Sequence, residues 1–385
     1  MRAYLDHSAT TPPDPRVVEA MVEVMEGDQF GNPSSLHALG LEAERRVEEA
    51  RRQVARLVEA APEEITFTSG GTEANNLAVL GGARALARRG RHVLVSAVEH
   101  PSVREAARRL ADEGFEVEEI PVDREGRVLP EVLAERVRPD TVLVSVMRVN
   151  NEVGTLQPVE DLIRVVKERR PEALFHVDAV QAVGLTRVTP RAWGCDLLTV
   201  SAHKIHGPKG VGALWVRPGV HLIPLVWGGG QERDLRPGTE NVPGIVGFGR
   251  AAELALAWRE EAERVRALRR RLEEEILRRV PGARRLGPED DHAAPHILNL
   301  AFEGIRGEVL VHALEAEGVY VSTGSACSSR RQATSHVLVA LGEPERWREG
   351  AIRLSLSPKT QEAEVEAAIE AVVRQVEALR ALMGE

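Results

Sequence analysis

Short apolar runs alternate with amphipathic helical segments along the first 250 residues of the chain. The apolar runs are rich in strand-forming residues and lie at residues 65–68, 92–95, 141–147, 174–177 and 197–200, and residues 116–120 are a further strand candidate. Helical segments lie between several of them, at residues 73–89, 102–113 and 157–170. This alternation predicts an α/β fold with a mostly parallel sheet. Ligands of such sheets bind at the carboxyl ends of the strands.

The pattern changes after residue 242. Residues 242–277 predict a nearly continuous helix rich in Ala, Glu, Arg and Leu. The rest of the chain predicts strands at 296–302 and 319–322 and helices at 307–317 and 362–382. We therefore expect a large domain of residues 15–258 and a small domain of residues 1–14 and 259–385, the latter an α+β unit.

Composition narrows the class of protein. Hydrophobic residues make up 43% and charged residues 28%, which is typical of a soluble globular protein. The net charge is −9 and the basic residues are dispersed, which argues against nucleic acid as a ligand. The chain shows no apolar stretch of membrane-spanning length and no signal peptide at its start. We therefore expect a cytoplasmic protein without a membrane partner.

A rare lysine directs attention to one strand end. Arginines number 46 and lysines only four, and Lys204 follows the apolar run at 197–200 in the sequence Ser-Ala-His-Lys. Unlike arginine, lysine can lose its proton and form a Schiff base with an aldehyde. Taken alone, Lys204 is equally well interpreted as one more charged loop residue.

Two other strand ends carry complementary chemistry. Residues 68–75 combine a strand end, a glycine turn and a helix start, an arrangement suited to binding a phosphate. The alternative interpretation is an ordinary helix-capping turn. Asp178 directly follows the run at 174–177, and a carboxylate there is suited to keeping a pyridine nitrogen protonated. The alternative interpretation is that Asp178 is a helix N-cap. Phosphate cradle, aspartate and lysine, in that order, are the parts that a pyridoxal-phosphate site needs.

Eight segments together resemble the class V aminotransferase family, and within it the cysteine desulfurases of the NifS/IscS type. They lie at residues 4–12, 30–34, 68–75, 149–154, 176–181, 201–212, 236–239 and 325–327, and the resemblance extends from residue 4 to about 357. It implies a fold-type-I enzyme with pyridoxal 5'-phosphate as cofactor, and a homodimer. The implied large domain has a mostly parallel seven-stranded sheet, and the implied C-terminal domain is smaller and α+β.

The resemblance also implies roles at the cofactor ring. Lys204 carries the cofactor as a Schiff base, and Asp178 pairs with the pyridine nitrogen. Gln181 and Asn151 contact the hydroxyl side of the ring. His100 stacks on the ring and shuttles protons.

For the phosphate, the resemblance implies four residues of this chain: Gly71, Thr72, Ser201 and His203. Thr239 of the other subunit joins them. For the substrate, it implies that Arg353 clamps the carboxylate, with Asn32 and Asn151 nearby. Bidentate binding of a carboxylate is a property of arginine.

Cys327 distinguishes a desulfurase from an aminotransferase. It lies among small residues at 322–329, which predict a mobile, exposed thiol able to attack a substrate sulfur and hold it as a persulfide. Cys195 precedes an apolar run and is interpreted as a small buried cysteine. Arg330 and Arg331 depart from the family pattern and favour the thiolate of Cys327.

The resulting hypothesis is a desulfurase that converts L-cysteine to L-alanine and passes sulfur to an acceptor, such as an iron–sulfur scaffold protein or a protein of thio-cofactor synthesis. A selenocysteine lyase or β-lyase on the same scaffold is the nearest alternative, and a catalytically silent scaffold is another. No metal is expected, because His203 and His206 are interpreted as a phosphate contact and a loop histidine without further ligands.

Overall fold

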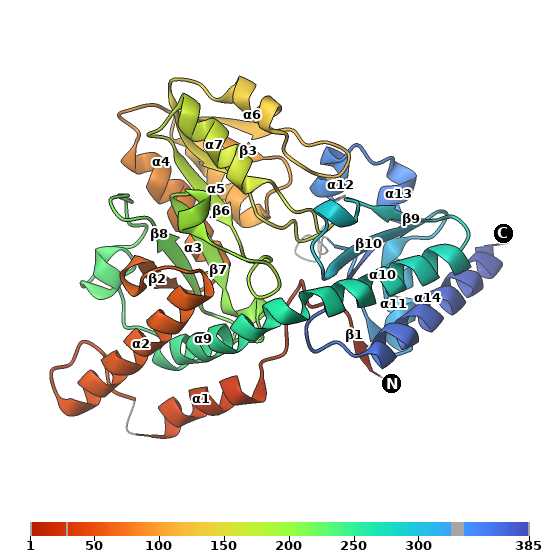
Figure 1. The fold of residues 1–385 in the computed structure, drawn as a ribbon, viewed down its shortest axis with the longest axis horizontal. Coiled ribbons are helices and arrows are strands. Elements are labelled where there is room, and N and C mark those ends of the chain that lie inside the picture. The colour runs from red at the N-terminus through yellow and green to blue at the C-terminus, as the bar shows by residue number, and fades with distance from the viewer. Residues whose placement is uncertain (1, 28–29, 325–334, 384–385) are drawn as a thin grey trace.

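A seven-stranded sheet lies at the centre of the larger part of the molecule (Figure 1). The computed structural model describes residues 2–27, 30–324 and 335–383. β8 runs antiparallel to both of its neighbours, β2 and β7, and the other neighbouring strands described in this sheet are parallel, so the predicted α/β class with a mostly parallel sheet is confirmed. Across the sheet the strands are β2 (Ile65–Thr68), β8 (Gly212–Val216), β7 (Leu197–Ser201), β6 (Leu174–Asp178), β5 (Thr141–Ser145), β3 (His92–Ser96) and β4 (Glu116–Ile120).

Helices cover both faces of this sheet. Alternate residues of one strand point to opposite faces, so Leu174 packs into one hydrophobic cluster and Phe175 into the other. Strands buried on both faces have continuous apolar sequences, which explains why these runs were visible in the sequence. One face packs against α1 (Pro15–Glu26), α2 (Ala38–Leu57), α6 (Pro130–Arg136), α7 (Val159–Arg169), α8 (Pro190–Trp193) and α9 (Val242–Ala255), and the other against α3 (Gly71–Asn76), α4 (Gly82–Ala85) and α5 (Pro101–Asp112).

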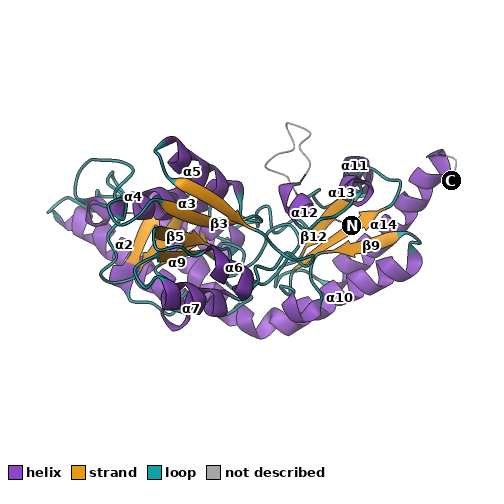
Figure 2. Cartoon of the chain, turned by 90° about the horizontal axis from the view of Figure 1, so that it is seen from above, coloured by secondary structure: helices purple, strands orange, loops and turns teal. Residues whose placement is uncertain are grey.

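The second part lies beside the first and has sheets of its own (Figure 2). One sheet is antiparallel, with the order β12 (Ala351–Ser355), β10 (Ile297–Phe302) and β9 (Ala283–Leu286). In the other, β1 (Ala3–Tyr4) pairs in parallel with β11 (Val319–Tyr320), so the start of the chain joins its C-terminal part. The helices here are α10 (Ala262–Arg279), α11 (Gly307–Ala316), α12 (His336–Ala340), α13 (Glu345–Glu349) and α14 (Glu362–Met383). The domain boundaries expected at residues 14/15 and 258/259 stay a prediction.

Two predicted helices are interrupted, each beside a close tertiary contact. The helix predicted at 73–89 contains a π-helical segment, Leu77–Gly81, and its last α-helical turn ends at Ala85. A side chain at Gly81 would lie 2.6 Å from the carbonyl oxygen of Ile223, so this close neighbour leaves room only for glycine. The helix predicted at 242–277 changes to a 3₁₀ segment at Leu256–Glu261, from which Trp258 packs edge-on against His206 at 5.2 Å. The strand predicted at 141–147 ends at Ser145.

Buried histidines gather where the N-terminal segment meets the two parts. The ring of His7 lies 5.7 Å from that of His206, and His296 lines the same small cavity. Burial, with a further contribution from His206 and His296, lowers the pKa of His7 to about 3. Burial lowers the pKa of His206 and of His296 to about 4. These rings are therefore neutral in the folded protein at neutral pH.

The histidine cluster predicts a loss of stability in mild acid. The unfolded chain binds a proton at each of these histidines below about pH 6.5, whereas the folded chain binds them only near pH 4 and below. The free energy of unfolding should therefore fall by about 2 kcal/mol per histidine between pH 7 and pH 5. Urea unfolding at both pH values measures this loss.

His296→Gln should reduce the pH dependence of unfolding, because one of these proton-binding groups is removed. His312→Gln is the matched control, because the side chain of His312 is 79% exposed. An equal pH dependence in wild type and His296→Gln would contradict the role given to the cluster.

Candidate active site

A cavity of about 280 Å³ lies at the carboxyl ends of β6 and β7, beside the start of α3. Ten residues predicted to form the site line it: Gly71, Thr72, His100, Asn151, Asp178, Gln181, Ser201, His203, Lys204 and Arg353. Asn32 and Thr239 are exposed and are not among its lining residues. Cys327, Arg330 and Arg331 lie outside the described residues.

Lys204 meets the N-terminal segment in this cavity. It ends a single 3₁₀ turn, Ala202–Lys204, directly after β7. Its Nζ donates to the main-chain oxygens of Ser8 and Ala9, the latter at 2.8 Å. The amine is thus held at a fixed position by a segment almost two hundred residues away in the chain.

Asp178 is buried at the end of β6 and uses both carboxylate oxygens. Oδ1 accepts from the amide of Val180 at 2.9 Å, and Oδ2 accepts from Asn75 Nδ2 at 2.7 Å. The local bond to Val180 is of the kind that a helix N-cap makes, but residues 180–185 form turns and no helix begins here. Because Asp178 also lines the cavity, a group bound there meets an oriented carboxylate.

The turn from β2 into α3 provides donors for an anion. Gly70 has φ 150° and precedes the first helical residues, whose amides have no partners within the helix. Gly71 packs close to the opposite wall, where an added Cβ would lie 3.1 Å from Val180 Cγ2. Ser201 Oγ is buried and finds no hydrogen-bond partner among the described residues. Helix amides and an unused hydroxyl together fit a phosphate group.

His203 completes this side of the cavity as a neutral ring. Its Nδ1 lies 3.2 Å from Thr10 Oγ1. Burial, reinforced by the charges of Lys204 and Lys209, lowers the pKa of His203 to about 4. A neutral histidine binds a phosphate by hydrogen bonding and adds no charge.

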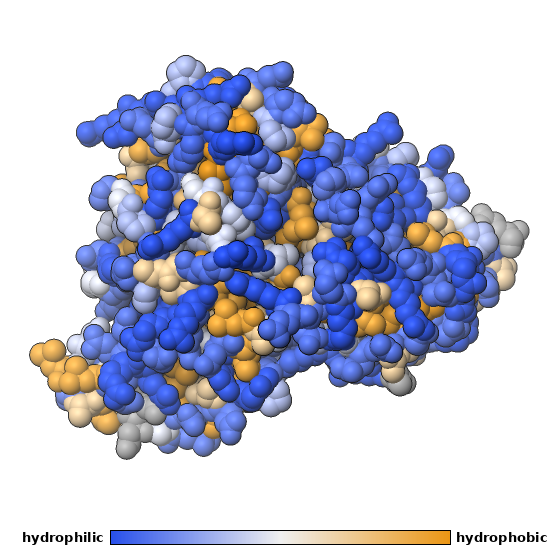
Figure 3. Space-filling view, viewed as in Figure 1, coloured by the Kyte–Doolittle hydropathy of each residue, from blue (hydrophilic) through white to orange (hydrophobic). Residues whose placement is uncertain are grey.

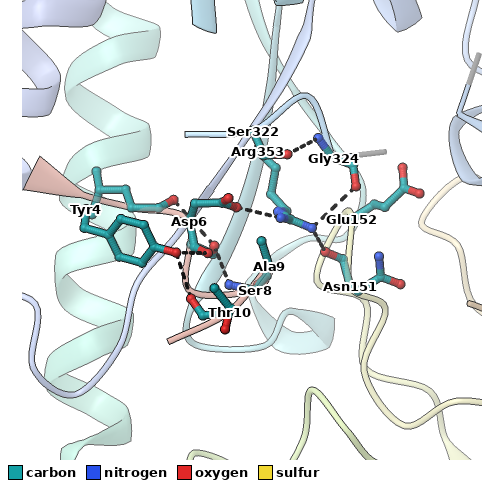
Figure 4. Close-up of polar contacts among 12 residues, drawn as sticks. Tyr4, Asp6, Ser8, Ala9, Thr10, Asn151, Glu152, Ser322, Gly324 and Arg353 are labelled. Carbon is teal, nitrogen blue, oxygen red and sulfur yellow. Dashed lines mark hydrogen bonds and ion pairs between the residues drawn. The ribbon is translucent and has the colours of Figure 1, made fainter. Parts of the chain in front are cut away.

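Arg353 lines the cavity from the C-terminal part of the chain and already has partners there (Figure 4). It lies in β12, and its side chain is only 2% exposed. Nη2 pairs with Asp6 Oδ1 at 2.7 Å, and Nη1 donates to the main-chain oxygen of Asn151 at 2.8 Å. Arg353 Nε is buried without a partner among the described residues. The guanidinium is therefore oriented before a substrate carboxylate arrives.

Several residues of the cavity were not anticipated from the sequence. Asn75 lies within the recognised segment 68–75, and Ser102 begins a predicted helix, but neither position signalled a contact with the site. Glu152 is buried, which raises its pKa, and it accepts from Ser335 Oγ at 2.6 Å. His336 and Asp6 come from the two ends of the chain, so only the fold brings them to the site.

Two further observations concern metal binding and the reactivity of Cys195. Within the described ranges, no group of three His, Cys, Asp or Glu side chains is arranged to hold a metal ion. Cys195 is fully buried, and its Sγ contacts the main-chain oxygen of Pro190 at 3.5 Å. Burial raises the pKa of the Cys195 thiol, so this cysteine is a poor nucleophile.

Comparison with known proteins gives consistent matches. The family model "Aminotransferase class-V" matches residues 3–368. "Cysteine desulfurase IscS 1" of Archaeoglobus fulgidus is 46% identical over 380 residues, covering 98% of each chain. "Cysteine desulfurase, mitochondrial" of Arabidopsis thaliana is 46% identical over 98% of this chain and 83% of its own length.

Solved structures match over nearly the whole chain as well. A "NIFS-like protein" has a TM-score of 0.92 at 41% identity and covers 98% of this chain and 100% of its own. "SspA in complex with cysteine" has a TM-score of 0.80 at 33% identity, covering 93% and 100%.

The unpartnered Ser201 hydroxyl predicts a specific loss of phosphate binding. In the protein stripped of cofactor, Ser201→Ala should weaken pyridoxal-phosphate binding about tenfold, the effect of one hydrogen bond to a charged group. Binding of pyridoxal, which lacks the phosphate, should not change. Absorbance titration with both compounds measures this difference.

Ser145→Ala is the matched control for this titration, because Ser145 is a buried serine at the end of β5 in the same sheet and does not line the cavity. An equal loss for pyridoxal and pyridoxal phosphate in Ser201→Ala would contradict the phosphate role.

Proposed function

The chain belongs to the aminotransferase class-V family, and we propose that it is a cysteine desulfurase, which converts L-cysteine to L-alanine and transfers the sulfur to an acceptor protein. As a member of this family it is a pyridoxal-phosphate enzyme. The observation that carries the proposal is the arrangement of Lys204, Asp178 and Arg353 around one cavity, with the donors of the β2–α3 turn beside them.

The cavity residues divide into those for the cofactor and those for the substrate. Pyridoxal phosphate, when bound, supplies an aldehyde for the substrate amine and a ring that withdraws electrons from the substrate Cα. We assign Lys204 to the aldehyde, Asp178 to the ring nitrogen, and Gln181 and Asn151 to the hydroxyl side of the ring. The phosphate is assigned to Gly71, Thr72, Ser201 and His203.

The remaining residues act on the substrate. Arg353 binds the carboxylate of cysteine, and the released amine of Lys204 takes the proton from its Cα. The Cys327 thiolate then attacks the substrate sulfur, so that a sulfur–sulfur bond forms as the carbon–sulfur bond breaks and its electron pair stays with the carbon. Protonation of that carbon and return of a proton from Lys204 to Cα yield alanine, and Cys327 keeps the sulfur as a persulfide for the acceptor.

We also propose a homodimer in which Thr239 reaches the partner's site, and we assign Asn32 to the substrate together with Arg353. The side chains of Thr239 and Asn32 are both exposed in the described chain. Large apolar side chains are exposed as well: Phe30 is 67%, Leu36 93% and Trp227 75% exposed. Figure 3 shows hydrophobic side chains at the edge of the molecule near the start of α2. Apolar surface of this kind is typical of protein interfaces.

The cellular setting stays a prediction. The helices of the described chain include none long and apolar enough to cross a membrane. We infer a cytoplasmic enzyme whose acceptor is an iron–sulfur scaffold protein or another sulfur carrier. Arg330 and Arg331, next to the thiol, are expected to influence which acceptor docks.

Replacing the proposed nucleophile tests the reaction. Cys327→Ala should keep the absorbance of the bound cofactor but release sulfide from cysteine slower by a factor on the order of 10³ or more, because no other thiol receives the sulfur. Mass spectrometry of wild type after cysteine is added should show one additional sulfur atom on Cys327. Cys195→Ala is the matched control and should retain turnover.

Three outcomes would change this assignment. Unimpaired sulfide release by Cys327→Ala would exclude the persulfide mechanism. Faster turnover of selenocysteine than of cysteine, retained in that variant, would indicate a selenocysteine lyase. If the wild-type protein develops no cofactor absorbance band when pyridoxal phosphate is added, the proposal of a pyridoxal-phosphate enzyme is excluded.

A further inference from the structure

His100 lies beside the cavity and also begins α5 as its N-cap. Its Nδ1 accepts a hydrogen bond from the amide of Ser102 at 3.1 Å and lies 2.8 Å from Ser102 Oγ. The amide hydrogen points at Nδ1, and a second hydrogen on that nitrogen would meet it head-on. Nδ1 is therefore the unprotonated nitrogen of the neutral ring, and the ring proton lies on Nε2.

A buried asparagine extends this contact. Asn75 is 1% exposed, and its Nδ2 donates both to Ser102 Oγ at 2.8 Å and to Asp178 Oδ2 at 2.7 Å. Because an ionised carboxylate only accepts hydrogen bonds, the nitrogen of the Asn75 amide must face Asp178. The Ser102 hydroxyl thus accepts from Asn75, which leaves its own hydrogen to donate toward His100 Nδ1.

We propose that Asn75 and Ser102 are positioning residues that hold His100 as the neutral tautomer with its proton on Nε2. His100 therefore presents a hydrogen-bond donor to a ligand in the cavity and is not the base. This role deepens the proposed function and rests on it for the identity of the reaction, in which Lys204 takes the Cα proton. The tautomer itself follows from the contacts alone.

The charges around His100 are consistent with a neutral ring. Burial lowers the pKa of His100, the charge of Asp178 opposes that effect, and the charge of Lys204 adds to it. His336, whose Nε2 lies 3.0 Å from the main-chain oxygen of Glu99, is near the same ring. Burial lowers the pKa of His336 to about 4, so it is neutral too.

Nitrogen NMR of the histidine ring tests the tautomer directly. In protein labelled with ¹⁵N in its histidine rings, His100 is identified as the signal lost in His100→Gln. At neutral pH, with and without bound cofactor, we expect Nε2 to be protonated and Nδ1 to be unprotonated. A protonated Nδ1, or two averaged nitrogens, in the wild-type protein would overturn the proposal.

Two variants test whether Asn75 and Ser102 impose this state. Ser102→Ala removes the hydroxyl but keeps the amide, and should raise the proton affinity of His100 about tenfold, the effect of one lost hydrogen bond. Asn75→Ala should change it in the same direction, because it removes the donor that directs the hydrogen of the Ser102 hydroxyl toward Nδ1.

Asn76→Ala is the matched control. Asn76 is the next residue of α3 and donates to the main-chain oxygen of Ser102 at 3.3 Å, so it leaves the hydroxyl untouched. The proton affinity of His100 should be the same in this control as in wild type.

The titration outcomes are separable from those of catalysis. Unchanged proton affinity in folded Ser102→Ala would overturn the positioning role, and this variant decides the matter if Asn75→Ala does not fold. If the expected tautomer is found in a protein that does not release sulfide from cysteine, the proposed function fails and the positioning role stands. If the protein releases sulfide from cysteine but His100 carries its proton on Nδ1, the positioning role fails and the proposed function stands.

Discussion

Residues 3–14 of the chain hold the two parts of the molecule in one arrangement. Main-chain bonds join Leu5 to Tyr320 and to Ser355 in the C-terminal part. A few residues later, the amide and the hydroxyl of Thr11 both donate to the main-chain oxygen of His203, at the end of the central sheet. Polar groups buried at such a junction need partners, so the segment cannot shift without breaking bonds on both sides.

The same segment fixes the distance between the two positive groups of the cavity. Asp6 pairs with Arg353, and the main-chain oxygens of Ser8 and Ala9 accept from Lys204. The amine of Lys204 and the guanidinium of Arg353 belong to different parts of the molecule. Both are nevertheless held by neighbouring residues of the N-terminal segment. A substrate with an amine and a carboxylate requires this kind of fixed spacing, because its reacting groups must be held at defined positions.

Much of the fold could be predicted because its strands are buried on both faces. The runs at 92–95, 174–177 and 197–200 were apparent as apolar segments, and the order of phosphate turn, aspartate and lysine followed from them. Strand β9 carries two arginines and β12 contains Arg353, so neither has the apolar pattern of a strand. The breaks in the two long helices were not predicted either, and the residues packed beside them, Ile223 and His206, are distant in the sequence.

By itself, the sequence determined the fold class, the family and the cofactor-bearing strand ends, because these depend on local periodicity and on short segments whose residue types suit one chemistry. Only the tertiary structure decided that Asp6 forms an ion pair with Arg353 and that Asn75 donates hydrogen bonds to both Asp178 and Ser102. The reason is physical: these are hydrogen bonds between residues 27 to 347 positions apart, and the partner of a buried polar group depends on how the chain folds back on itself.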